Sequence, residues 1–156
     1  MKAPYTNYRL IIEPKDLEND LLIACIEGDI DLLKGTLDFA KYNNIALNLC
    51  YDEGLLGVIA AQNGHTSVLK VIDKYDPNMI RNYGTELLSQ AAVNGKTECI
   101  EFLLSKQIDP TPLKDTSAYN NYSEVEQIFE QYLFQHNKNV EIKELGNDSY
   151  YPDFEA

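Results

Sequence analysis

The stretch Gly84–Pro110, GTELLSQAAVNGKTECIEFLLSKQIDP, decides the fold because it holds two short apolar-striped segments separated by a tight turn. The first segment covers 87–93, the second covers 99–104, and Asn94-Gly95 forms the turn. This spacing predicts a helical hairpin. Each helix is about ten residues long, below the roughly 12 to 15 at which an isolated helix becomes marginal in water. The hairpin therefore needs similar neighbours on both sides, as in a solenoid.

The same pattern occurs twice upstream, with turns at Gly28 and Gly64. Around the first turn, helices are predicted over 17–27 and about 30–42, and repeat two begins with a helix over 55–63. A pair of small residues occupies the same place in each first helix: Ala24-Cys25, Ala60-Ala61 and Ala91-Ala92. Small side chains at these positions allow neighbouring hairpins to approach closely.

These residues resemble the ankyrin repeat. The matching positions in the best copy are Gly84, Leu88, Ala91-Ala92, Gly95, Cys99-Ile100, Leu103-Leu104 and Asp109-Pro110. The resemblance implies an all-α, ankyrin-repeat solenoid of stacked helix-turn-helix units, joined by extended fingers over 43–54 and 76–83. It also implies binding of protein partners rather than catalysis.

Three segments are predicted along the chain: an extended N-terminal arm over 1–14, a repeat domain over 15–136 and an acidic tail over 137–156. The tail is expected to be disordered in the free state, with docking on the last helix or service as a linear motif as alternatives. Within the domain the predicted units are repeats over about 16–49, 50–80 and 81–110, followed by a degenerate cap over 111–136.

The cap differs from the repeats in composition. Asn121 stands where the other turns have glycine, and asparagine is the residue that best replaces glycine in a left-handed turn. Glu126 and Glu130 replace apolar residues, so one side of the last helix is expected to face water, as a terminal cap requires.

The formal net charge is −12, from 25 acidic and 13 basic residues. This balance disfavours nucleic acid and anionic lipid as partners, because binding phosphate needs clustered Lys and Arg. A protein partner with a basic or mixed surface fits better, although acidity can also serve solubility alone. No apolar run reaches membrane-spanning length, and residues 1–7 lack a signal-peptide core. We expect a monomer in the cytoplasm, or in a host cell if the chain is a secreted effector.

The chemistry-bearing residues give no enzyme signature. Cys25, Cys50 and Cys99 are an odd number without C-x-x-C spacing, which indicates neither a disulfide framework nor a zinc site. His65 holds a turn position where the ankyrin pattern itself prefers histidine. Cys50 is the cysteine expected to be accessible, and no flanking basic residue lowers its pKa. No catalytic residue, metal or cofactor is predicted.

The main departure from the family lies at its T-P-L-H segment, which none of the three repeats retains. The threonine–histidine hydrogen bonds between repeats are therefore expected to be missing, leaving apolar contacts to hold the array. Repeat two is expected to be the least stable, because Gly57 stands in place of the usual leucine.

By the resemblance, a partner contacts finger tips and the exposed ends of first helices. Carried over by position, these residues are Tyr51, Asp52 and Glu53 in the first finger, Asn82, Tyr83 and Thr85 in the second, and Gln62, Asn63, Val93 and Asn94 before the turns. Tyrosines beside carboxylates favour a basic partner.

Three functions remain open from the sequence. The first is a protein-interaction module that acts as an adaptor, an inhibitor or a secreted effector. The second is an immunity or antitoxin-like protein whose acidic surface blocks a basic enzyme. The third is an enzyme that uses Cys50 or His65.

Overall fold

The computed structural model of the chain describes residues 14–116 and 122–146, with side chains up to residue 137. The predicted N-terminal arm, apart from its last residue, lies outside the described residues, as does the end of the predicted tail, 147–156.

The described residues form helices and contain no strand, so the all-α prediction is confirmed. Proline is favourable in the first turn of a helix, which explains why the first helix begins at Pro14, ahead of the predicted start at residue 17. The elements are α1 (Pro14–Glu27), α2 (Ile30–Tyr42), α3 (Tyr51–Asn63), α4 (Thr66–Tyr75), α5 (Asn78–Val93), α6 (Thr97–Ser105), the 3-10 turn η1 (Thr111–Leu113) and α8 (Ser123–Gly146).

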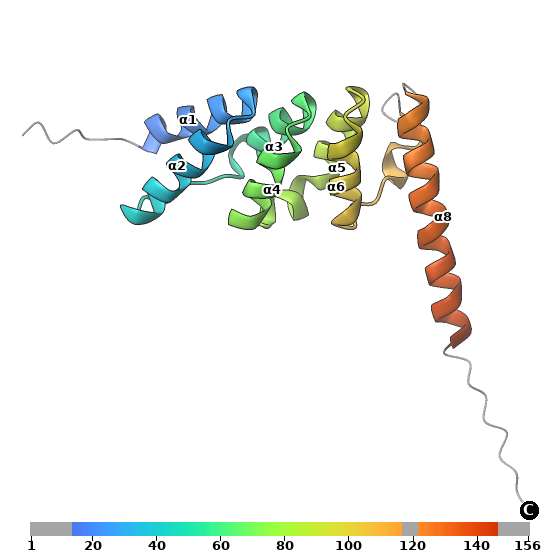
Figure 1. Cartoon of the computed structure of the whole chain (residues 1–156). Coiled ribbons are helices and arrows are strands. Elements are labelled where there is room, and N and C mark those ends of the chain that lie inside the picture. Colours follow the sequence, from blue (N-terminus) through green and yellow to red (C-terminus); the bar gives the residue numbers. More distant parts are fainter. Residues whose placement is uncertain (1–13, 117–121, 147–156) are drawn as a thin grey trace, which may run out of the picture.

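The helices stack as pairs in two layers (Figure 1). Within each repeat the first helix packs on the second: α1 on α2, α3 on α4 and α5 on α6. Between repeats the first helices α1, α3 and α5 form one layer, and the second helices α2, α4 and α6 form the other. The final helix α8 packs on α6 and extends beyond the array (Figure 1).

The three pairs of small residues lie in the core between these layers, as their positions predicted. Both members of each pair are fully buried. Burial of apolar surface stabilises the array by roughly 25 cal/mol per Å² removed from water. Since no helix pair buries its faces alone, most of that stabilisation comes from neighbouring repeats.

Each turn glycine is covered by a side chain from the next unit. Gly28, Gly64 and Gly95 all have positive φ, which favours glycine. His65 covers the first of them, Lys96 the second and Tyr122 the third. The covering residue follows the glycine of its own turn, so the contact repeats along the solenoid. Tyr122 follows Asn121 in the same way, although residue 121 itself lies outside the described part.

The second finger differs from the prediction, because helix begins where extended chain was expected. In the first finger α3 is assigned from Tyr51, but Asp52, Glu53 and Gly54 are left-handed, so the right-handed helix begins at Leu55, as predicted. The second finger is replaced by the start of α5. The Asp76 side chain accepts a hydrogen bond from the backbone N–H of Asn78 (3.0 Å), and Pro77 supplies a helix-compatible φ of −62°. Met79 and Ile80 are then buried in helical register, which explains why a helix is preferred here.

The predicted boundary between cap and tail at residue 136 is also wrong, because α8 continues to Gly146. The sequence between Ser123 and Gly146 contains no proline or internal glycine that would stop a helix. In the cap itself Val125 and Phe129 are fully buried, whereas Glu126 and Glu130 are exposed, in agreement with a helix that has one face in water.

Polar contacts join the repeats, which corrects the expectation that only apolar contacts would do so. Nε2 of His65 donates to the carbonyl oxygen of Ile26 (3.0 Å), since a carbonyl can only accept. The Thr66 hydroxyl lies 3.1 Å from the sulfur of Cys99, and both residues are buried. The Tyr75 hydroxyl donates to the carbonyl of Leu37 (3.1 Å). Turn residues and second helices thus replace the missing threonine–histidine bonds.

The space beside Gly57 is filled by two side chains of α5. A Cβ at this position would lie 3.0 Å from Cδ2 of Leu87 and 3.1 Å from the sulfur of Met79, both of which are fully buried. Gly57 therefore allows α3 and α5 to pack closely, which removes the reason given for a weak second repeat. The stability order of the repeats stays a prediction.

Candidate protein-interaction surface

The chain makes an unusual left-handed turn at the start of α3. Asp52, Glu53 and Gly54 have φ/ψ of 48°/54°, 56°/34° and 81°/27°. For each of the two residues with a side chain, this conformation costs roughly 1–2 kcal/mol. Strained backbone of this kind persists only where the surrounding structure enforces it.

The ring of Tyr83 supplies that enforcement. It lies against Gly54 so closely that a Cβ on the glycine would be 2.8 Å from the ring carbons. Gly54 is buried, whereas Asp52 and Glu53 are exposed. The packing between the glycine and the tyrosine therefore fixes the turn and presents the two carboxylates at the surface.

A groove of about 530 Å³ opens beside this turn, between α3 and α5. Its apolar part is formed by Leu55, Val58 and Tyr83, all half-buried. The residues that line it carry three carboxylates and no basic group: Asp52, Glu53, Leu55, Val58, Tyr83 and Glu86. Such a lining favours a cation with an apolar stem, as in a Lys or Arg side chain.

One of the groove carboxylates is oriented by its own helix. Oε1 of Glu86 accepts a hydrogen bond from the side-chain amide of Gln90 (2.9 Å), one turn further along α5. An amide donor holds the carboxylate without neutralising it, so its negative charge remains available to a ligand.

The structure brings together three residues of the predicted binding set, Asp52, Glu53 and Tyr83, in this groove. Asn82 and Thr85 are exposed on α5 but do not line it. Tyr51 is half-buried and packs against the core. Burial, together with the nearby carboxylate of Glu18, raises the pKa of Tyr51. Tyr51 therefore anchors α3 instead of standing at a finger tip.

The other predicted contact residues lie at the far end of the same helices. Gln62 and Asn63 end α3, and Val93 and Asn94 end α5. At 1.5 Å rise per residue, Gln62 and Asn63 lie roughly 15 Å along α3 from the acidic turn. The predicted set thus forms two separate groups, one at the start of α3 and the middle of α5, and the other at the C-terminal ends of both helices.

The sequence reasoning missed several residues of this layer. Leu55, Val58 and Glu86 line the groove but were not predicted as contacts. On α1, Ile23 and Ile26 are 44% and 49% exposed. The signal for Ile26 was present, because it precedes its turn glycine by the same two residues as Gln62 and Val93, both of which were in the predicted set.

The cysteines are all free thiols with raised pKa values. Burial raises the pKa of Cys25 to about 12. It also raises that of Cys99, although the Thr66 hydroxyl acts in the opposite direction. The pKa of Cys50 is raised by burial and by the carboxylate of Asp76, which accepts a hydrogen bond from its sulfur (3.7 Å). Because the thiolate is the nucleophile, none of the three is an activated cysteine.

Short helices stacked in two layers, with a glycine turn inside each pair, define a helical-repeat protein of the solenoid class. The chain belongs to the ankyrin-repeat family: the family model for ankyrin repeats in three copies matches residues 21–114 and, in an overlapping match, 58–148. Ankyrin repeats are generally protein–protein interaction modules. Comparison with curated proteins and with solved structures gives no significant match.

No helix within residues 14–116 and 122–146 combines the length and the apolar content that a membrane span requires.

Proposed function

We propose that this chain is a protein-binding module that holds a basic segment of its partner in the acidic groove between α3 and α5. The observation that carries the proposal is the lining of that groove, where three carboxylates surround an apolar floor without a basic side chain. Membership in a family of protein-interaction modules agrees with it.

The recognition uses both parts of a basic side chain. The aliphatic stem of Lys or Arg packs on Leu55 and Val58, and its head reaches the carboxylates at the rim. Arginine gains further from Tyr83, because its guanidinium stacks on aromatic faces. Residues at the other end of the helices, Gln62 and Val93 among them, extend the contact along the same layer.

Two roles are compatible with this chemistry. As an adaptor, inhibitor or effector, the chain would use apolar contacts as well as charge. As an immunity or antitoxin-like blocker of a basic enzyme, it would depend mainly on charge, which the net charge of −12 favours. The first role is preferred because half of the residues that line the groove are apolar or aromatic.

A catalytic role for Cys50 or His65 is set aside. Burial and the Asp76 carboxylate raise the pKa of the Cys50 thiol, which disfavours the thiolate. His65 donates a hydrogen bond to the carbonyl of Ile26 in the neighbouring repeat. Three free thiols suit a reducing compartment such as the cytoplasm, and we propose that the chain acts there as a monomer.

The test measures binding of a fluorescein-labelled nona-arginine peptide by fluorescence anisotropy. The triple variant Asp52→Asn, Glu53→Gln, Glu86→Gln removes the groove charges. The matched control, Glu27→Gln, Asp115→Asn, Glu124→Gln, removes three exposed carboxylates elsewhere. We expect at least tenfold weaker binding for the groove variant and less than twofold change for the control. If both variants lost affinity for the peptide equally, binding would depend only on the net charge of the protein, and the groove would be rejected as the site.

The adaptor role and the blocker role are distinguished by how binding depends on salt concentration. Binding of a charge-driven blocker weakens steeply as ionic strength rises, because exposed charges are screened within about 10 Å at 0.1 M salt. Native complexes captured from lysate and washed at increasing salt therefore distinguish them: retention at high salt supports the adaptor role, and early release supports the blocker.

A further inference from the structure

A second groove, of about 610 Å³, lies in the other layer of the solenoid, between α2 and α4. It is lined by eight residues: Lys34, Leu37, Asp38, Lys41, Lys70, Val71, Lys74 and Tyr75. Four of the 13 basic residues of a chain with net charge −12 therefore gather at one place. The net charge of the residues that line this groove is positive, whereas that of the acidic groove between α3 and α5 is negative.

The lysines of this groove are not neutralised by the protein. The α4 carboxylate beside them, Asp73, instead forms an ion pair with Lys106, which follows α6. In the described part of the chain, none of the four groove lysines has a carboxylate within 4.0 Å. The lining thus carries four lysines and one carboxylate, that of Asp38, and three of the four ammonium groups remain for a ligand, because that of Lys70 lies over the ring of Phe102 on α6, 5.9 Å from its centroid.

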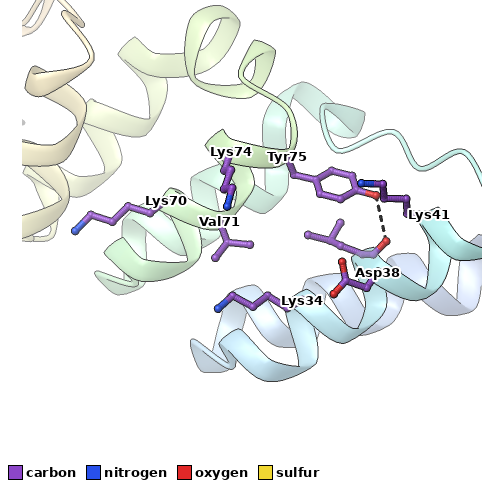
Figure 2. Close-up of a pocket in the computed structure, with 8 residues that line it drawn as sticks. Lys34, Asp38, Lys41, Lys70, Val71, Lys74 and Tyr75 are labelled. Atoms are coloured by element: carbon purple, nitrogen blue, oxygen red, sulfur yellow. Dashed lines mark hydrogen bonds between the residues drawn. The ribbon is translucent and has the colours of Figure 1, made fainter.

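The floor of the groove is apolar and preformed. Tyr75 reaches from α4 across to α2, where its hydroxyl donates to the carbonyl of Leu37 (3.1 Å) (Figure 2). Val71 and Lys74 of α4 face Lys34 and Asp38 of α2 (Figure 2). The hydrogen bond between the two repeats fixes the tyrosine ring as one wall, so a ligand meets a rigid apolar surface with amines around it.

This combination points to a peptide and not to a small anion. Phosphate sites commonly use backbone N–H groups at helix N-termini, whereas this groove runs along the sides of two helices. Lysine stems, Val71 and Tyr75 offer an apolar surface that inorganic phosphate would leave unused. A segment with carboxylates on either side of an apolar or aromatic side chain uses both features.

We propose that the groove between α2 and α4 binds an acidic segment of a partner protein, with an apolar side chain on Val71 and Tyr75 and carboxylates on the lysines. The negative charge of the whole chain does not prevent this, because exposed charges are screened beyond about 8 Å at physiological salt. The solenoid then has two faces of opposite sign, and it joins a basic segment on one layer to an acidic segment on the other.

The test uses a fluorescein-labelled random copolymer of glutamate and tyrosine, which carries the proposed chemistry. Its binding is measured by fluorescence anisotropy at 50 and 300 mM salt. Lys34 and Lys74 are both exposed, so the double variant Lys34→Gln, Lys74→Gln is expected to fold normally. The matched control is Lys15→Gln, Lys114→Gln, two exposed lysines outside the groove. We expect at least tenfold weaker binding for the groove variant and less than twofold change for the control.

Three results would overturn the proposal. Equal losses in the groove and control variants would reject the groove as the site. Displacement of the copolymer by tripolyphosphate at a lower concentration than by unlabelled copolymer would assign the groove to small phosphate anions. Tighter copolymer binding after Asp148→Asn, Asp153→Asn and Glu155→Gln would assign it to the acidic end of the chain itself. Nona-arginine binding serves as an independent readout, because it tests the acidic groove and stays unchanged in the lysine variants.

Discussion

The imidazole of His65 lies directly over Gly28, so that a Cβ on the glycine would be only 2.5 Å from the ring nitrogen Nδ1. The other ring nitrogen, Nε2, donates to the carbonyl of Ile26 (3.0 Å). One side chain thus packs on the turn of repeat one and forms a hydrogen bond to its first helix. The contact explains why this glycine is required both for its positive φ and for its missing side chain.

Replacing the histidine tests this link between repeats. We expect His65→Ala to lower the free energy of unfolding by about 1–2 kcal/mol, because one hydrogen bond and the packing over Gly28 are lost. Gly28→Ala should cost about 2 kcal/mol or more, since it adds a clash to an unfavourable φ. Urea unfolding followed by circular dichroism measures both. A His65→Ala variant as stable as the wild type would show that the contact contributes nothing.

The close approach of α3 and α5 at Gly57 gives a second prediction. Restoring the family's leucine by Gly57→Leu should destabilise the protein by about 1–3 kcal/mol, because Met79 and Leu87 already fill the space. A thermal or urea melt is sufficient to measure it. If the leucine instead stabilised the fold, repeat two would be underpacked, as the sequence alone indicated.

Relief of the left-handed turn should stabilise the chain at the expense of binding. Glycine tolerates the conformation of Glu53 (φ 56°), so Glu53→Gly should raise the free energy of unfolding by about 0.5–1 kcal/mol. The same change at the exposed helical residue Glu101 should lower it by about 1 kcal/mol. The Glu53 variant should also bind nona-arginine more weakly. If Glu53→Gly and Glu101→Gly lowered the free energy of unfolding by the same amount, the turn would be unstrained.

The last helix depends on one buried ring. Phe129 is fully buried, whereas Phe134, on the same helix α8, is 62% exposed. Phe129→Ala should therefore cost about 3–5 kcal/mol, or detach α8 from α6, and Phe134→Ala should cost less than about 0.5 kcal/mol. Hydrogen exchange in α8 and α6 distinguishes detachment from global unfolding. Similar exchange in both variants would contradict the packing of the cap.

The thiols should react in the order of their exposure and pKa. At pH 8 the buried Cys25, with its pKa of about 12, is almost entirely protonated and should resist iodoacetamide. Cys50 should react first, yet more slowly than a cysteine in an unfolded peptide. Burial and the Asp76 carboxylate raise the pKa of Cys50, so Asp76→Asn should lower that pKa and speed alkylation while keeping an acceptor for the N–H of Asn78 at the start of α5. Peptide mass mapping follows each site, and an unchanged Cys50 rate would rule out the carboxylate as the cause.

Sequence patterns predicted the solenoid well where the signal was local. The turn glycines, the apolar stripes and the pairs of small residues are short-range features that require a helical hairpin, and a hairpin this short must stack. The second finger was mispredicted because the family resemblance was given more weight than a local signal: Asp76-Pro77-Asn78 is a helix start. The boundary between cap and tail was predicted too early in the chain for a similar reason. The acidic composition was given more weight than the absence of a helix breaker before Gly146.

The sequence by itself determined the repeat, its all-α class and the acidic, tyrosine-containing stretches, because spacing and residue type are properties of the chain alone. Only the tertiary structure decided which of these residues meet. Stacking places Tyr83 against Gly54 and gathers three carboxylates between α3 and α5, while Lys34 and Lys74 come together from different repeats. These groupings depend on contacts between residues about 30 or more positions apart. Such contacts are set by the register in which the helices pack, and no local sequence pattern specifies that register.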